Sequence, residues 1–192
     1  DAQRIIGNIS RAVERARSEA VPVIWVQHSN QELPKDSVQW QWVPELVPAN
    51  GEALIHKTYN SSFEQTSLDA ELARLGATHI VLAGAATNWC IRATAYGALD
   101  RGYDLTLVKD AHTTESMQLD GGRVIEAETV VQELNIAMKW LEYPGRKNNT
   151  AGANDIDGKA ASRCRSMWIR SASILPVSDI TAARSRQFSN SR

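Results

Sequence analysis

The sequence is poor in cysteine and contains no long apolar run, so it resembles neither a disulfide-rich secreted protein nor a membrane-spanning one. Cys90 and Cys164 are its two cysteines, so at most one disulfide could form, and we expect a reducing, cytoplasmic location. No stretch approaches the roughly 18 consecutive apolar residues that a membrane-spanning helix needs. Residues 1–10 lack the apolar core of a signal peptide, so nothing in the sequence argues for export.

Three common catalytic or ligand-binding motifs are also missing. The glycines at Gly84 and Gly121–Gly122 do not have the spacing of a phosphate-binding loop. Ser61 and Ser62 lack the G-x-S-x-G setting of a serine nucleophile. No second histidine follows His28 at the spacing of a metal site, so we predict that the protein binds no metal and needs no cofactor.

The overall composition is that of one globular domain, but charge divides the chain into two parts. The chain has 192 residues, enough for one substantial core but not comfortably for two domains. Residues 1–158 carry 14 Lys and Arg against 21 Asp and Glu, whereas residues 159–192 carry 7 against one Asp. The serine-rich segment 159–192 has no helical or strand period, so we predict a disordered or non-native tail after a domain at 1–158. A basic tail that binds nucleic acid or an anionic surface is the alternative, but we expect no nucleic-acid or membrane partner.

Hydrophobic periodicity predicts alternating strands and helices in residues 1–158. Strands are predicted at short apolar runs and helices at segments with a 3.6-residue period: strands at 21–26, 53–56, 78–83 and 103–108, and helices around 5–16, 67–75, 89–101 and 123–141. Strands that alternate with helices over short connections indicate an α/β fold with a parallel sheet. The polar stretch 29–51, with Trp40 and Trp42, is expected to be a long loop that covers a pocket or contacts another subunit.

Cys90 is the strongest candidate for a catalytic residue because of its place in this pattern. Ligands of open parallel sheets bind beyond the carboxyl ends of the strands, and Gly84–Cys90 joins the strand at 78–83 to the next helix. A thiol in the first turn of a helix lies near the positive end of the helix dipole and near unpaired N–H groups, which favour the nucleophilic thiolate and could hold an oxyanion. A free cysteine that only packs in the core is the alternative, and position alone does not decide between the two.

Other strand ends contribute further candidates. Lys57, Tyr59 and Phe63 follow the second predicted strand, and Trp89 precedes Cys90. The three aromatic side chains could form a wall for a planar substrate, although Phe63 and Trp89 could equally pack in the core. We expect His112, in the predicted loop 109–122, to be solvated, with a role in the pocket as the alternative.

Three segments resemble motifs of the isochorismatase-like hydrolases. Gly84–Ile91 looks like the cysteine motif of that family, His56–Phe63 is similar to its lysine motif, and Lys109–Thr114 resembles the segment after its next strand. The likeness runs from about Arg4 to about Asp157, and the spacing between the lysine and cysteine motifs also fits. The resemblance implies a three-layer α/β/α sandwich with a parallel, Rossmann-like sheet.

The resemblance also implies a mechanism and a role for each matching residue. Members of the family use an Asp–Lys–Cys triad, in which the cysteine attacks a carbonyl or imine-like carbon and forms a thioester that water hydrolyses. Cys90 would be the nucleophile and Lys57 its charged partner, with the backbone N–H groups of Ala86 and Cys90 as the oxyanion hole and a cis peptide between Ala85 and Ala86. We therefore expect a hydrolase, acting as a homo-oligomer, that cleaves an amide or carbamoyl C–N bond of a small molecule.

The chain departs from the family pattern at the catalytic Asp, which lies at the end of the first, central strand in the family. Asp1 begins an Asp-x-Gln sequence without a preceding strand, so we predict that Asp1 caps a helix. Ile174–Asp179 could imitate the missing strand, but Pro176 argues against a central position. We therefore expect the sequence to lack this strand and its acid, and the sheet to have a gap at its centre. A catalytically silent binding or assembly protein, a fragment, and a flavodoxin-like binding module stay as alternatives to an enzyme.

Overall fold

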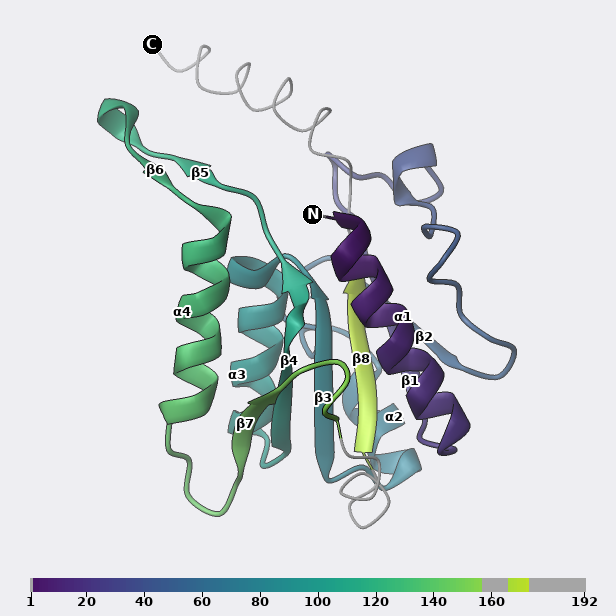
Figure 1. The fold of residues 1–192 in the computed structure, drawn as a ribbon. Helices are drawn as coiled ribbons and strands as arrows, with labels where there is room; N and C mark the ends of the chain where they lie inside the picture. Colours follow the sequence, from purple (N-terminus) through teal and green to yellow (C-terminus); the bar gives the residue numbers. More distant parts are fainter. Residues whose placement is uncertain (1, 157–165, 173–192) are drawn as a thin grey trace.

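Short apolar runs of the sequence form the strands of a parallel sheet that is covered by helices on both faces (Figure 1). The computed structural model describes residues 2–156 and 166–172. The six strands lie in the order β2-β1-β8-β3-β4-β7, and every neighbouring pair is parallel. Their bounds are β1 Val23–His28, β2 Ala53–Lys57, β3 His79–Ala85, β4 Asp104–Thr113, β7 Asn148–Ala151 and β8 Ser166–Ala172.

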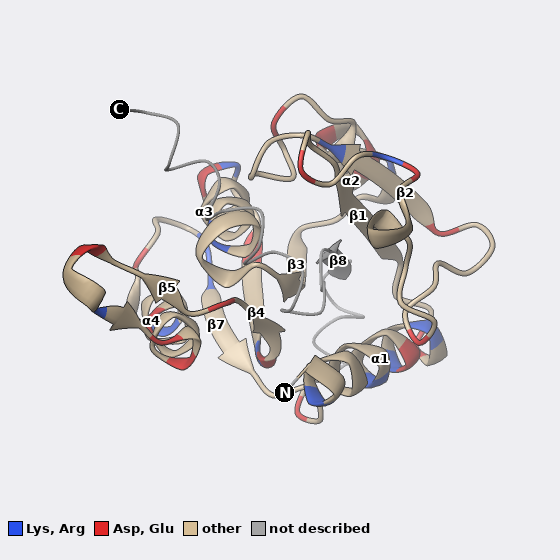
Figure 2. Cartoon of the chain, turned by 90° about the horizontal axis from the view of Figure 1, so that it is seen from above, with Lys and Arg blue, Asp and Glu red and all other residues tan. Residues whose placement is uncertain are grey.

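Four α-helices and a short hairpin complete the described fold. The helices are α1 (Ala2–Ser18), α2 (Leu68–Leu75), α3 (Arg92–Asp100) and α4 (Ala127–Trp140), and the hairpin pairs β5 (Met117–Gln118) with β6 (Val124–Ile125). Figure 2 shows α1 on one side of the sheet and α2 and α3 on the other. The predicted α/β fold class is therefore confirmed. Among the described residues, no helix has the length and apolar character needed to cross a membrane.

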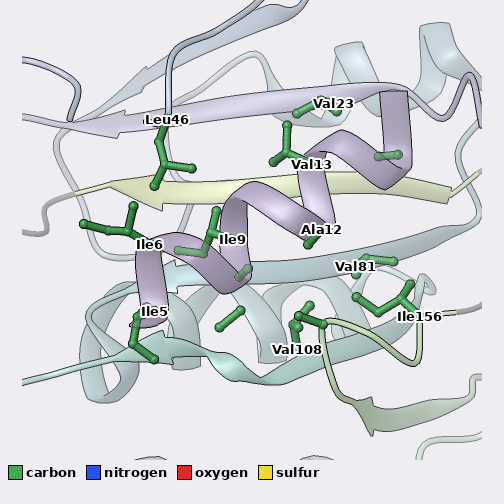
Figure 3. Close-up of a cluster of buried hydrophobic side chains, with 14 of the residues drawn as sticks. Ile5, Ile6, Ile9, Ala12, Val13, Val23, Leu46, Val81, Val108 and Ile156 are labelled. Atoms are coloured by element: carbon green, nitrogen blue, oxygen red, sulfur yellow. The ribbon is translucent and has the colours of Figure 1, made fainter. Parts of the chain in front are cut away.

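The two faces of the sheet bury different side chains because successive residues of a strand point to opposite sides. In β1, Ile24 and Val26 pack with α2, α3 and α4, whereas Val23 and Trp25 pack with α1. Strands β3 and β4 alternate in the same way. Helix α1 contributes one apolar face to its side of the core, as Figure 3 shows, with Ile5, Ile6, Ile9, Ala12 and Val13 all buried.

The centre of the sheet is occupied, so our prediction of a gap was wrong. Strand β8 lies between β1 and β3 and is parallel to both, with Ile24 opposite Ile169 and Val81 opposite Trp168. This strand falls in the segment 159–192 that composition separates from the rest. The sequence did not predict it because its apolar run, Met167–Ile169, has only three residues.

Several predicted boundaries also change. The helix predicted at 89–101 begins as a π-helical turn, η2 (Thr87–Ile91), before α3, and β4 continues to Thr113, which places His112 in a strand. Strand β7 was not predicted. The N-cap role of Asp1 and the strand-like segment Ile174–Asp179 lie outside the described residues, as does Cys164.

The packing of α1 predicts a large stability difference between two identical substitutions. Ile9 is 1% exposed in the core beneath α1, whereas Ile136 on α4 is 59% exposed. Ile9→Ala removes a buried side chain and leaves a cavity, so it should lower the free energy of unfolding by about 2–5 kcal/mol. Ile136→Ala should change it by less than about 1 kcal/mol. Urea denaturation measures both values, and equal losses would contradict the burial of this helix face.

Candidate active site

The carboxyl ends of β1, β2 and β3 bring the predicted candidates Lys57 and Cys90 together with His28. His28 ends β1 and Lys57 ends β2, and the two residues are direct partners in the parallel pairing. Partners in register point to the same face of the sheet, and the Lys57 Nζ lies 3.5 Å from the His28 Nδ1. Cys90 follows β3 in the turn η2. Residues separated by up to 62 positions, from His28 to Cys90, therefore meet at one edge of the sheet.

The Lys57–Cys90 contact is the centre of this site. Lys57 Nζ donates a hydrogen bond to Cys90 Sγ at 3.0 Å, and it also donates to the backbone carbonyls of Tyr59 at 2.8 Å and Asn60 at 3.0 Å. Lys57 is only 2% exposed, and Cys90 is buried. An ammonium group has three N–H bonds, and each of them has one acceptor here. The amine is thus held in a fixed position, with one of its protons directed at the sulfur.

The electrostatics of Lys57 depend on that sulfur. Burial lowers the pKa of Lys57 below its usual value of 10.5, while the charge of Cys90 and the hydrogen bond to it act in the opposite direction. A buried ammonium is costly unless an opposite charge compensates it, and a thiolate at Cys90 would provide that charge. An ammonium at Lys57 and a thiolate at Cys90 would therefore compensate each other's charge in this buried position.

His28 is a neighbour of Lys57 that the sequence interpretation considered only as a metal ligand. The pKa of His28 is lowered from 6.5 to about 4, mainly by burial and then by the positive charge of Lys57, while a hydrogen bond with the Tyr59 backbone opposes both effects. The imidazole is neutral near pH 7 and presents Nδ1 to the ammonium as a fourth potential acceptor. Within the described residues, Lys57 has no recorded contact with a carboxylate, and no group of His, Cys, Asp or Glu there could hold a metal.

The turn that carries Cys90 has an unusual backbone. The peptide bond between Ala85 and Ala86 is cis, as the family resemblance implies. Gly84, with φ of 129°, adopts a conformation that side chains disfavour, next to an irregularity in the pairing of β3 with β4. The Ala86 carbonyl then accepts the N–H groups of both Trp89 and Ile91, the latter forming the wide π-helical turn. Cys90 lies between these two donors at the start of the helix, as predicted.

The lysine and cysteine motifs are also joined by a buried hydroxyl pair. Ser62 and Thr94 are both fully buried, and the Thr94 Oγ1 lies 2.9 Å from the Ser62 Oγ and accepts the backbone N–H of Ser62 at 3.0 Å. This pair connects the loop after β2 to helix α3. It therefore fixes the backbone that supplies two of the acceptors of Lys57.

The predicted aromatic residues have different environments. Tyr59 is 48% exposed and Trp89 is 49% exposed, so both present apolar surface beside residues of the site. Phe63 is buried in the core, where it stacks on Tyr103 at 6.2 Å and lies under the guanidinium of Arg101 at 4.5 Å. The structure thus brings two of the three to the surface, and Phe63 follows the core-packing alternative.

Further residues near these strand ends and in the long loop are held by contacts with other parts of the fold. Gln27 points away from His28 and donates to the Trp40 carbonyl at 2.6 Å, which holds the long loop after β1. The expectation that His112 is solvated was wrong: it is 1% exposed because β4 extends past the predicted strand end. Trp42, in the same long loop as Trp40, packs edge-on against Trp25 of the core.

Comparison with known proteins identifies related chains. Over 108 residues the chain is 31% identical to the secreted isochorismatase effector Isc1 of Verticillium dahliae, covering 54% of this chain and 57% of that protein. Over 139 residues it is 28% identical to the ureidoacrylate amidohydrolase RutB of Methylobacterium radiotolerans, covering 56% and 54%. The chain spans about half the length of the relatives it matches.

A solved structure has a similar fold, and a family model matches the residues that carry the lysine and cysteine motifs. The crystal structure of an isochorismatase from Pseudomonas putida superimposes with a TM-score of 0.70 at 28% identity, covering 80% of this chain and 77% of that one. Residues 1–126, which include β1 to β3, Lys57 and Cys90, match the isochorismatase domain. The chain belongs to the isochorismatase family.

Proposed function

We propose that the protein is a cysteine hydrolase that cleaves a C–N bond of a small amide or carbamoyl compound. The observation that carries this proposal is the buried hydrogen bond from Lys57 Nζ to Cys90 Sγ at 3.0 Å. A packing cysteine needs no such partner, whereas a thiolate nucleophile does. The name of the relative RutB, an amidohydrolase, supports C–N cleavage.

The proposed reaction proceeds in two steps. In the first, the Cys90 thiolate attacks the carbonyl carbon, the backbone N–H groups of Ala86 and Cys90 bind the oxyanion, and the C–N bond breaks as the nitrogen takes a proton from Lys57. In the second, the neutral Lys57 amine takes a proton from water, which attacks the thioester and releases the acid and the thiolate. The lowered pKa of Lys57 suits an amine that alternately donates and accepts a proton.

Tyr59 and Trp89 are the proposed substrate-binding side chains. Each exposes about half of its surface, and each is attached to a segment of the site: the Tyr59 carbonyl accepts from Lys57, and Trp89 directly precedes Cys90. Planar amides would pack against such rings. Phe63 is left out of this proposal because its ring packs in the core against Tyr103. We also propose that the enzyme forms a homo-oligomer. Its low cysteine content favours a location in a reducing compartment.

A second candidate function is that of a catalytically silent member of the family. The observation that favours it is that Lys57, within the described residues, contacts the His28 ring, two carbonyls and the sulfur but no carboxylate, whereas a triad of the family would contain an Asp. Such a protein would keep the fold and bind a small molecule or a partner without turnover.

Replacement of the nucleophile separates these two functions. A panel of small amides and carbamoyl compounds should be hydrolysed by the wild-type protein, with release of ammonia or amine as the measured signal. Cys90→Ser should reduce the rate by at least ~10³-fold because the weaker nucleophile cannot form the thioester. Cys164→Ser is the matched control and should keep the activity. Turnover that survives in Cys90→Ser would contradict the proposal, and no turnover of any amide by the wild type would favour the silent function.

The role of Lys57 as the charged partner of Cys90 can be tested even though the substrate is not known. Lys57→Ala removes a charge-assisted hydrogen bond to the sulfur, so alkylation of Cys90 by iodoacetamide at pH 7 should slow by roughly 10- to 100-fold. Lys139→Ala, at an exposed lysine of α4, should leave the rate unchanged. Mass spectrometry of the peptide that contains Cys90 measures the rate. An unchanged rate in Lys57→Ala would remove this residue from the site.

The lowered pKa of His28 predicts a pH dependence of stability. The unfolded chain binds a proton at His28 below about pH 6.5, whereas the folded protein does so only near pH 4, so stability should fall as the pH falls from 6.5 to 4. His28→Gln should reduce this loss by about 1 kcal/mol, a figure reduced to allow for the half-exposed ring. Urea denaturation at both pH values measures the difference, with His56→Gln at an exposed position of β2 as control. An identical pH dependence in His28→Gln and wild type would show that the pKa of His28 is not lowered in the folded protein.

A further inference from the structure

A second buried polar network lies directly behind the turn that carries Cys90. Thr87 is the first residue of η2 and is fully buried, and its Oγ1 lies 2.9 Å from the Nδ1 of His112, which is 1% exposed. The Nε2 of His112 lies 3.0 Å from the Oδ1 of Asn135 on α4, and the Nδ2 of Asn135 donates to the Lys109 carbonyl at 3.1 Å. Three elements, η2, β4 and α4, are thus connected by side chains alone.

The network has only one consistent direction of donation. A carbonyl can only accept, so the Asn135 Nδ2 donates to Lys109, and the Asn135 Oδ1 is then an acceptor. His112 must donate to it from Nε2, and in a neutral imidazole this leaves Nδ1 without a proton. The Thr87 hydroxyl therefore donates to Nδ1. Burial lowers the pKa of His112, against smaller opposing effects of Asn135 and Asp110, which agrees with the neutral tautomer that this pattern requires.

The position of Thr87 makes this chain of bonds relevant to the nucleophile. No side chain caps η2 at its start, because the residue before it is Ala86. The next residue, Asn88, is also attached to the segment after β4, through the Thr114 hydroxyl and the Met117 sulfur. Two consecutive side chains therefore fasten the turn between the cis peptide and Cys90 to β4 and to the segment that follows it.

We propose that Thr87, His112 and Asn135 are positioning residues that hold the Cys90 turn in its reactive geometry. The inference rests on the proposed function, since it assigns these residues to the reactivity of that same thiol. Their side chains act through the backbone of η2. This role requires a hydroxyl group at position 87 that donates a hydrogen bond to the neutral ring of His112.

Two variants at position 87 test this role, with two separate readouts. Thr87→Val keeps the shape of the side chain but removes the donor. Hydrogen exchange of the backbone amides of residues 88–90 should therefore become roughly tenfold faster, and alkylation of Cys90 should become roughly tenfold slower. Thr87→Ser retains the hydroxyl and should restore both values. Adding Thr87→Val to His112→Gln should change the exchange and alkylation rates no further than His112→Gln alone, because the Thr87–His112 bond is already lost in the single variant.

A similar pair at the other end of the sheet supplies the control. Thr106 and His79 lie near the starts of β4 and β3, and their Oγ1 and Nε2 atoms are also 2.9 Å apart. Thr106→Val should lower stability without changing either readout at the Cys90 turn. If Thr87→Val lowers stability as Thr106→Val does but leaves exchange and alkylation at wild-type values, the positioning role is refuted. If the wild-type thiol proves unreactive, the proposed function fails, whereas the amide exchange of residues 88–90 still decides the positioning role.

Discussion

The structure of the site depends on how a lysine can be kept almost fully buried. Removing an ammonium group from water costs several kcal/mol, and the fold compensates for this with three acceptors at 2.8–3.0 Å. Two acceptors are backbone carbonyls, Tyr59 and Asn60, which carry only partial charge. The third is the sulfur of Cys90, which can carry a full negative charge. In the proposed function this negative charge is that of the nucleophilic thiolate, and it would stabilise the buried lysine.

The rest of the fold serves to bring this pair together. Lys57 ends β2 at one edge of the sheet, whereas Cys90 follows β3, and parallel strands place both carboxyl ends on the same side. The Ser62–Thr94 pair then holds the loop after β2 against α3, and the Thr87–His112 pair holds the turn after β3 against β4. Each reactive side chain therefore has a buried hydroxyl nearby that fixes its backbone. Such support is what a site needs if its geometry is to be kept within fractions of an ångström.

Much of the reactive centre could be predicted from the sequence, because strand ends and local motifs determine it. The apolar runs before Lys57 and Cys90 indicate parallel strands, and the rule that such sheets bind ligands at their carboxyl ends selects both residues. The supporting contacts could not be predicted in this way. His112 meets Thr87 only because β4 extends to Thr113, and a period-2 pattern does not reveal where a strand ends.

The central strand and the aromatic wall show the same limit. Strand β8 is placed by its pairing with β1 and β3, which no local pattern in its seven residues indicates. Phe63 is the last residue of the lysine motif in the sequence, but the stacking of Tyr103 and Arg101 on its ring is a long-range effect. His28 could have been placed beside Lys57 from the register of β1 and β2, had the pairing of the two strands been known.

The most direct test of the account compares the same thiol in the folded and the unfolded protein. Iodoacetamide labelling at pH 7, followed by mass spectrometry of the Cys90 peptide, gives the alkylation rate in buffer and in denaturing urea. A cysteine that only packs in the core should react more slowly when folded, because the reagent cannot reach it. The account predicts the opposite, a faster reaction in the folded protein, since Lys57 favours the thiolate there. A folded rate at or below the unfolded rate would contradict the claim that Lys57 and Cys90 form a reactive pair.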